Sequence, residues 1–119
     1  MAKPRVNPGE GHAAVEAVLA GSAERIHTAT AVRYLLQLIS DQVPGHTVEL
    51  RVPPFGAIQC VEGPEHTRGT PPNVVEMDPA TWIALATGSL SWSAAYDAGQ
   101  ISASGLRSDL SALVPLAEW

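Results

Sequence analysis

Three side chains could in principle form a nucleophilic catalytic set: Cys60 as nucleophile, His66 as base and Asp78 as the residue that orients the base. These residue types occur in most chains, and their order in the sequence does not fix their geometry. The four histidines are too widely spaced for two of them to occupy one helix face, as local zinc motifs require. We therefore expect no catalytic residues, no bound metal and no enzyme activity.

The polar stretch at residues 63–72 (GPEHTRGTPP) is the best candidate for specific polar recognition. His66, Arg68 and two threonine hydroxyls could hold a carboxylate or phosphate head group, because charge-assisted hydrogen bonds from an arginine fork discriminate such groups well. The same side chains could instead satisfy turns or bond to Glu62 or Glu65. The turn-forming interpretation is favoured, and the head-group site is the alternative.

Residues 9–14 (GEGHAA) partly match the glycine pattern of dinucleotide-binding sites. That pattern needs a preceding strand to aim the loop at a pyrophosphate, and no strand is expected before residue 9. Asn7, Pro8 and Glu10 instead supply a cap, a first-turn proline and a carboxylate three residues after the cap. The segment therefore predicts the start of a helix and no cofactor.

Hydrophobic side chains are dense in the carboxy-terminal half of the chain. Considered alone they indicate a core, because an apolar stripe at helical spacing is far more often packing than pocket wall. These residues are Trp82, Ile83, Leu85, Leu90, Trp92, Tyr96, Ile101, Leu106, Leu110 and Leu113.

Helix signals occur at both ends of the chain. The first helix should begin after Asn7 and end at Gly21, and the second should carry an apolar stripe from Val32 to Val43 and end at residues 44–45. Three shorter helices are expected further along: one after Asp78 that Gly88 closes, one that Ser89 or Ser91 caps and that runs through Tyr96, and one that begins at residues 108–109 and stops at Pro115.

Strands are expected at residues 47–52, 55–61, 73–77 and 100–104. Polar and apolar residues alternate most clearly in residues 47–52, which indicates a half-buried strand. The first three strands should form a meander. Because strands cluster early instead of alternating regularly with helices, the order of elements predicts an α+β fold.

The composition is that of one domain that can fold without disulfides. The chain has 119 residues, 45% of them hydrophobic, and a single cysteine, Cys60. We expect one domain over residues 1–119, with a helical segment at residues 1–45 and the sheet with its covering helices at residues 46–116.

Charge and hydropathy argue against two classes of partner. A net charge of −5 repels polyphosphate and anionic lipid, so nucleic acid is not expected as a partner. The longest purely apolar run, residues 82–86, is far shorter than the ~20 residues of a membrane span, so stable membrane insertion is not expected. Residues 1–8 lack the apolar stretch of a secretory signal, which favours a cytoplasmic location.

Three segments together resemble small bacterial sterol-carrier-family proteins: residues 51–57 (RVPPFGA), 66–76 (HTRGTPPNVVE) and 86–92 (ATGSLSW). The section from residue 78 to residue 105 is also similar to sterol carrier protein 2 domains more broadly. The resemblance implies a mixed, mostly antiparallel sheet of about four to five strands covered by about five helices. It also implies an apolar tunnel between sheet and helices that takes fatty acyl chains or sterols.

The resemblance favours the interpretation of these apolar residues as the wall of a pocket. The hypothesis is a binding or carrier module for an apolar ligand, lined by the residues named above other than Leu110, with His66 or Arg68 at the mouth. One alternative is a non-enzymatic interaction domain with a filled core, which could form a homodimer. Another is an accessory domain related to the carboxy-terminal domain of mycothiol-dependent maleylpyruvate isomerases, whose helical metal-binding partner domain is not in this sequence.

Overall fold

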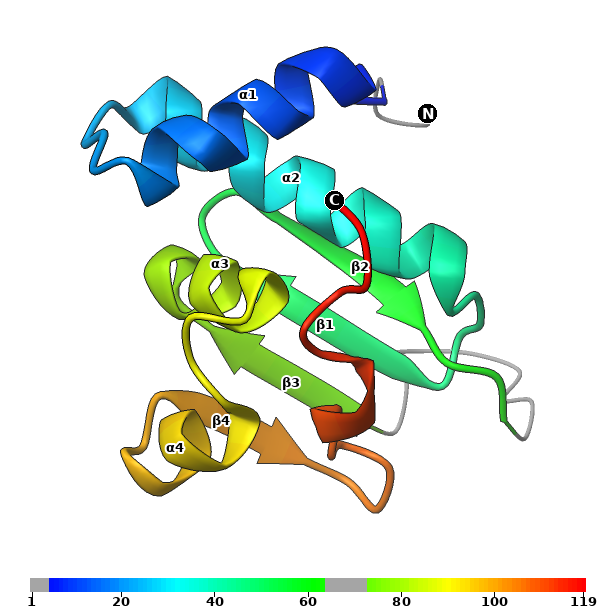
Figure 1. The fold of residues 1–119 in the computed structure, drawn as a ribbon. Coiled ribbons are helices and arrows are strands. Elements are labelled where there is room, and N and C mark those ends of the chain that lie inside the picture. The colour runs from blue at the N-terminus through cyan, green and yellow to red at the C-terminus, as the bar shows by residue number, and fades with distance from the viewer. Residues whose placement is uncertain (1–4, 64–72) are drawn as a thin grey trace.

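The computed structural model describes residues 5–63 and 73–119, which form a mixed sheet covered by helices (Figure 1). The α+β class and the sterol-carrier-like arrangement predicted from the sequence are confirmed, with four α-helices and one short 3₁₀ turn among the described residues. In chain order the elements are α1 (Pro8–Leu19), α2 (Arg25–Gln42), β1 (Val48–Val52), β2 (Gly56–Cys60), β3 (Asn73–Met77), α3 (Pro79–Thr87), α4 (Trp92–Asp97), β4 (Ile101–Ser104) and the 3₁₀ turn Ser111–Leu113.

Side-chain caps fix where the helices begin. The Asn7 side chain accepts from the backbone N–H of Gly9 at 2.8 Å, and Asp78 accepts from Thr81 N–H at 2.7 Å. Ser91, one of the two serines considered, accepts from Ala94 N–H at 3.2 Å. Gly88 closes α3 in the left-handed conformation at φ 91°. These local predictions are confirmed.

The strand order β2-β1-β3-β4 corrects the expected meander. β3 pairs with β1 in parallel, whereas β1–β2 and β3–β4 are antiparallel. A buried amide holds this arrangement, because Asn73 donates to Thr47 O at 2.9 Å and accepts from Arg107 N–H at 2.8 Å. Alternation of polar and apolar residues identifies a strand but not its neighbour, and so the sequence pattern could not give this order.

The helices cover one face of the sheet, and α1 lies on α2 on the side away from it (Figure 1). The inward residues of β1 are fully buried, and the stripe on α2 from Val32 to Ile39 packs into the same core. Gly11 lets α1 approach α2, since a Cβ at this position would lie 2.2 Å from Tyr34 Cγ. The glycine of the dinucleotide-like pattern therefore has a packing role.

The expected last helix is wrong: only the 3₁₀ turn Ser111–Leu113 forms. Between Asp109 and Pro115 the chain has too few residues for a stable α-helix, and a proline disfavours the helical conformation in the residue before it. The segment instead crosses the helical layer. Leu116 N–H donates to Ala86 O at 2.9 Å, and the Trp119 ring stacks on His12 with centroids 4.9 Å apart.

Replacement of the α3 cap tests how much this helix start contributes. Asp78→Ala should lower the free energy of unfolding by about 1 kcal/mol, because Thr81 N–H loses its acceptor. Asp78→Asn should lower the free energy of unfolding by at most a few tenths of a kcal/mol, since asparagine caps a helix about as well as aspartate. Urea denaturation of the three proteins measures this, and equal losses in both variants would contradict the capping role.

Candidate functional site

The polar residues that could suggest catalysis are dispersed. Cys60 is fully buried on β2, and Asp78 caps α3. His66 and Arg68, together with the proposed head-group loop, lie outside the described residues, so their interpretation stays a prediction. In the described ranges, no three histidine, cysteine or acidic side chains gather where they could hold a metal ion.

The described histidines each bond to a different neighbour. His12 contacts Glu16 at 2.9 Å, His27 contacts Ser22 Oγ at 2.6 Å, and His46 contacts Gln59 at 2.7 Å. Each of these side chains therefore has a structural contact on its own part of the surface. None of the helices α1–α4 in the described residues is both long and apolar enough to cross a bilayer.

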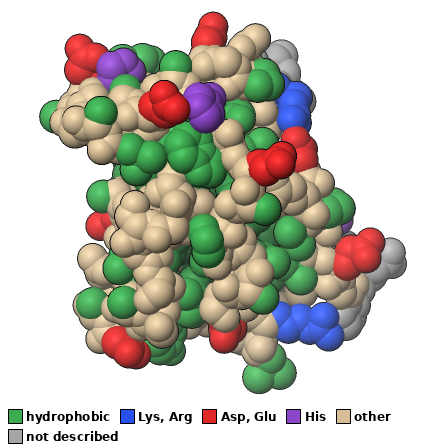
Figure 2. Space-filling model, in the orientation of Figure 1, with side chains coloured by type: hydrophobic (Ala, Val, Ile, Leu, Met, Phe, Trp, Pro, Cys, Tyr) green, Lys and Arg blue, Asp and Glu red, His purple; other side chains and the backbone are tan. Residues whose placement is uncertain are grey.

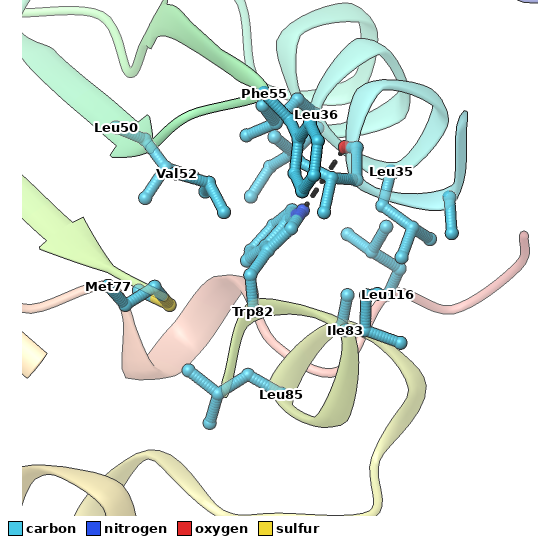
Figure 3. Close-up of a cluster of buried hydrophobic side chains, with 14 of the residues drawn as sticks. Leu35, Leu36, Leu50, Val52, Phe55, Met77, Trp82, Ile83, Leu85 and Leu116 are labelled. Atoms are coloured by element: carbon cyan, nitrogen blue, oxygen red, sulfur yellow. Dashed lines mark hydrogen bonds between the residues drawn. The ribbon is translucent and has the colours of Figure 1, made fainter. Parts of the chain in front are cut away.

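The predicted pocket residues divide into two sets, and the first lies in the core (Figure 3). Trp82 is 1% exposed, and Ile83 and Leu85 beside it on α3 are equally buried. The Trp82 ring lies among side chains of α2, β1 and β3, and its Nε1 points at Val32 O at 3.4 Å. Ile101 on β4 is also buried. These side chains join the sheet to the helices.

The second set borders two open grooves on either side of Trp92. The larger, which we call the proline groove, has a volume of about 480 Å³ between α4 and the segment that leads to Pro115. The smaller, the tyrosine groove, has a volume of about 330 Å³ between α4, β4 and residues 108–109. Trp92, Ser93 and Asp109 line both grooves. The half-buried indole of Trp92 thus separates two adjoining spaces.

Of the other predicted residues, Leu90 lines the proline groove and Tyr96 lines the tyrosine groove. Tyr96 is 54% exposed, which leaves much of its ring accessible. Leu113 is half-buried, and Leu106 is fully exposed in the turn after β4. The remaining predicted residues in the described ranges line neither groove: Trp82, Ile83, Leu85, Ile101, Leu106 and Leu113.

Sequence reasoning did not identify most of the other groove residues, among them Ser93, Asp109 and Val114. Ser111 N–H donates to the Asp109 carboxylate at 2.9 Å, and this hydrogen bond lowers the pKa of Asp109. Asp97 adds a second carboxylate to the tyrosine groove. Asp109 and Val114 were missed because a continuous helix was expected over their segment, whereas only the 3₁₀ turn Ser111–Leu113 forms and both residues line the grooves beside α4.

Residues 24–116 match the family described as bacterial SCP ortholog, and the chain belongs to this family. The predicted kinship with bacterial sterol carrier proteins is confirmed. The match begins one residue before α2, so α1 precedes it. A search of curated proteins finds no match to the chain.

The two tryptophans should respond very differently to truncation. Trp82→Ala should lower the free energy of unfolding by ~3–5 kcal/mol, because it empties a fully packed site. Trp92→Ala should cost less than ~1.5 kcal/mol, since its half-buried indole borders open grooves. Urea denaturation measures both losses. A loss for Trp92→Ala as large as that for Trp82→Ala would make Trp92 a core residue.

The buried thiol gives a prediction about pH. Burial raises the pKa of Cys60 from 9.0 to about 11, so the unfolded chain loses this proton first as the pH rises. The contribution of the protonated thiol to stability is therefore complete below pH 9 and is lost as the pH rises to about 11. Over this range, the free energy of unfolding should fall more steeply in the native sequence than in Cys60→Ala.

A labelling experiment checks the same burial independently. A chromogenic disulfide reagent at about pH 8 should modify Cys60 only after denaturant is added, because the reactive thiolate is not formed in the buried site. Labelling of the native protein at the rate of an unfolded peptide would contradict this assignment.

Proposed function

We propose that this protein binds or carries an apolar ligand, such as an acyl chain, a sterol or another lipid, in the grooves beside Trp92. The observation that carries the proposal is the half-buried indole shared by two grooves of about 330 and 480 Å³. These volumes fall within the range of ~300–1,000 Å³ typical of small-molecule sites. Membership of a bacterial sterol-carrier family supports the same class of ligand.

The groove linings mix apolar side chains with serine hydroxyls and carboxylates. Figure 2 shows hydrophobic and uncharged polar groups over most of the face in view, with acidic side chains at several places on it. Leu90 and Val114 face the proline groove, and Trp92 offers a broad flat surface to both. An acyl chain gains about 0.8 kcal/mol per buried CH₂, so even partial burial in such a groove gives measurable affinity.

The carboxylates at the grooves select among lipids. Asp109 borders both grooves and Asp97 borders one, so an anionic head group would meet like charges. The proposed ligand therefore carries a neutral polar group, such as an alcohol, and not a free carboxylate.

The proposal includes the core residues that the carboxy-terminal segment covers. Leu110 and Leu116 are buried in the carboxy-terminal segment, and Leu116 lies beside Ile83 of α3 (Figure 3). Displacement of this segment would extend the proline groove toward Trp82, Ile83 and Leu85. The apolar chain of a ligand that binds in this way would take the place of Leu116 against α3.

Tryptophan fluorescence tests the proposal. Dodecanol and cholesterol, both neutral, should shift the emission of Trp82→Phe/Trp119→Phe, in which Trp92 is the only tryptophan, to shorter wavelength. Trp92→Ala should weaken binding of both probes about tenfold, because the indole surface is lost. Native mass spectrometry of the unmodified chain should detect the bound probe.

Charge variants provide the control. Dodecanoate should bind more weakly than dodecanol. Asp109→Asn should reduce this difference in affinity, because it removes the negative charge common to both grooves. Absence of any response to dodecanol and cholesterol would overturn the carrier proposal. Concentration-dependent dimerisation without a lipid response would favour the alternative of an interaction domain.

A further inference from the structure

A third groove lies elsewhere on the molecule, between α2 and β2. It has a volume of about 210 Å³ and shares no lining residue with the grooves beside Trp92. Leu36, Phe55 and Ile58 give it an apolar wall. Three consecutive residues of β2, Gly56, Ala57 and Ile58, line it. Because successive strand residues point to opposite faces, this contact places the groove along the edge of the strand.

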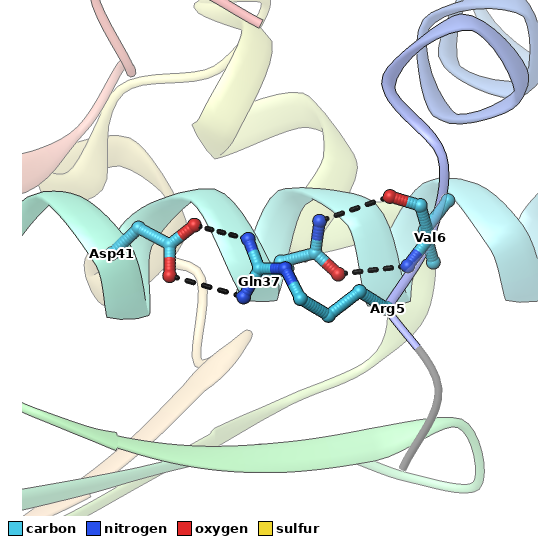
Figure 4. Close-up of polar contacts among 4 residues, drawn as sticks. All are labelled: Arg5, Val6, Gln37 and Asp41. Atoms are coloured by element: carbon cyan, nitrogen blue, oxygen red, sulfur yellow. Dashed lines mark hydrogen bonds and ion pairs between the residues drawn. The ribbon is translucent and has the colours of Figure 1, made fainter.

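Arg5 and Val6 line the groove and are held on α2 by polar contacts (Figure 4). The Gln37 side chain accepts from Val6 N–H at 2.8 Å and donates to Val6 O at 3.1 Å. The neighbouring Arg5 pairs with Asp41 at 2.5 Å, so the carboxylate of the groove is already neutralised. The ion pair offsets the negative charge of Asp41, which would otherwise repel an anion.

Positive charge gathers around Phe55. Arg33 Nε donates to Phe55 O at 3.0 Å, and Arg25 lies over the Phe55 ring at 4.8 Å. The first contact fixes the Arg33 guanidinium by one nitrogen and leaves its other two nitrogens for a ligand. Within residues 5–63 and 73–119, no carboxylate lies within ion-pairing distance of either arginine. A chain with net charge −5 thus carries a local excess of cations here.

The edge of the sheet adds further donors. β2 is the outermost strand of the order β2-β1-β3-β4. An edge strand presents backbone N–H groups that have no partner strand. A carboxylate at this edge can therefore accept from Arg33 with one oxygen and from the strand with the other.

We propose that this edge groove binds a short organic carboxylate, with its carboxylate on Arg33 and its apolar body against Leu36, Phe55 and Ile58. Its volume lies below the ~300 Å³ at which drug-sized sites begin, which favours a small molecule over a long lipid. This ligand is distinct in charge and size from the neutral lipid proposed beside Trp92.

Hexanoate is the probe that tests this site, with hexanamide as its neutral match. Titration followed by amide chemical shifts should show hexanoate perturbing Gly56, Ile58 and Ser40, with smaller changes from hexanamide. Arg33→Gln should weaken hexanoate at least about tenfold, because a charge-assisted pair is lost. Binding of hexanamide should change less than about twofold, since it carries no charge.

Arg107→Gln is the matched control, because Arg107 follows β4, at the opposite edge of the sheet from β2, and does not line the edge groove. It should leave hexanoate affinity within about twofold of the native value. If Arg33→Gln does not fold, Ile58→Glu at the partly exposed groove wall should abolish the hexanoate perturbations by like-charge repulsion.

Equal binding of hexanoate and hexanamide, or hexanoate shifts centred on Trp92 instead of Gly56, would overturn the edge-groove site. The second outcome would leave the neutral-lipid proposal standing but without its charge selection. If dodecanol does not bind beside Trp92 but hexanoate binds at Gly56, the neutral-lipid proposal fails and the edge-groove site stands.

Discussion

The rest of the structure depends on the burial of Trp82 between the sheet and the helical layer. Its indole packs against α2 and the inner face of the sheet, and its only polar atom points at a backbone oxygen of α2. This packing sets the position of α3, and Gly88 then turns the chain toward α4. The position of α3 in turn sets where α4 and Trp92 begin.

The same packing explains why the space around Trp82 is filled by side chains. A closed apolar void costs about 24 cal/mol per Å³, so an empty 300 Å³ tunnel would cost about 7 kcal/mol, comparable with the whole stability of a domain. Filling the space around Trp82 with Leu35, Leu36 and Phe55 avoids this penalty. Open grooves that water can enter do not carry it, and they remain accessible to a ligand.

Electrostatics distinguishes the two ligand sites that we propose. Carboxylates without a cationic neighbour in the lining border the grooves beside Trp92, whereas Arg5 and Arg33 line the edge groove together with Asp41. Both environments belong to one chain of net charge −5, so net charge alone does not predict which ligands each surface accepts. A neutral lipid and a small anion would then occupy separate sites on one protein.

The sequence by itself determined what depends on neighbouring residues. The caps at Asn7 and Asp78, the stop at Gly88 and the buried stripe of α2 follow from contacts within one or two turns, and so they could be predicted. The tertiary structure alone decided the parallel pairing of β3 with β1, the extended path of residues 114–119 and the placement of Asp109 and Val114 beside Trp92. These features join residues distant in sequence, and local periodicity carries no information about which distant partner gives the most favourable packing.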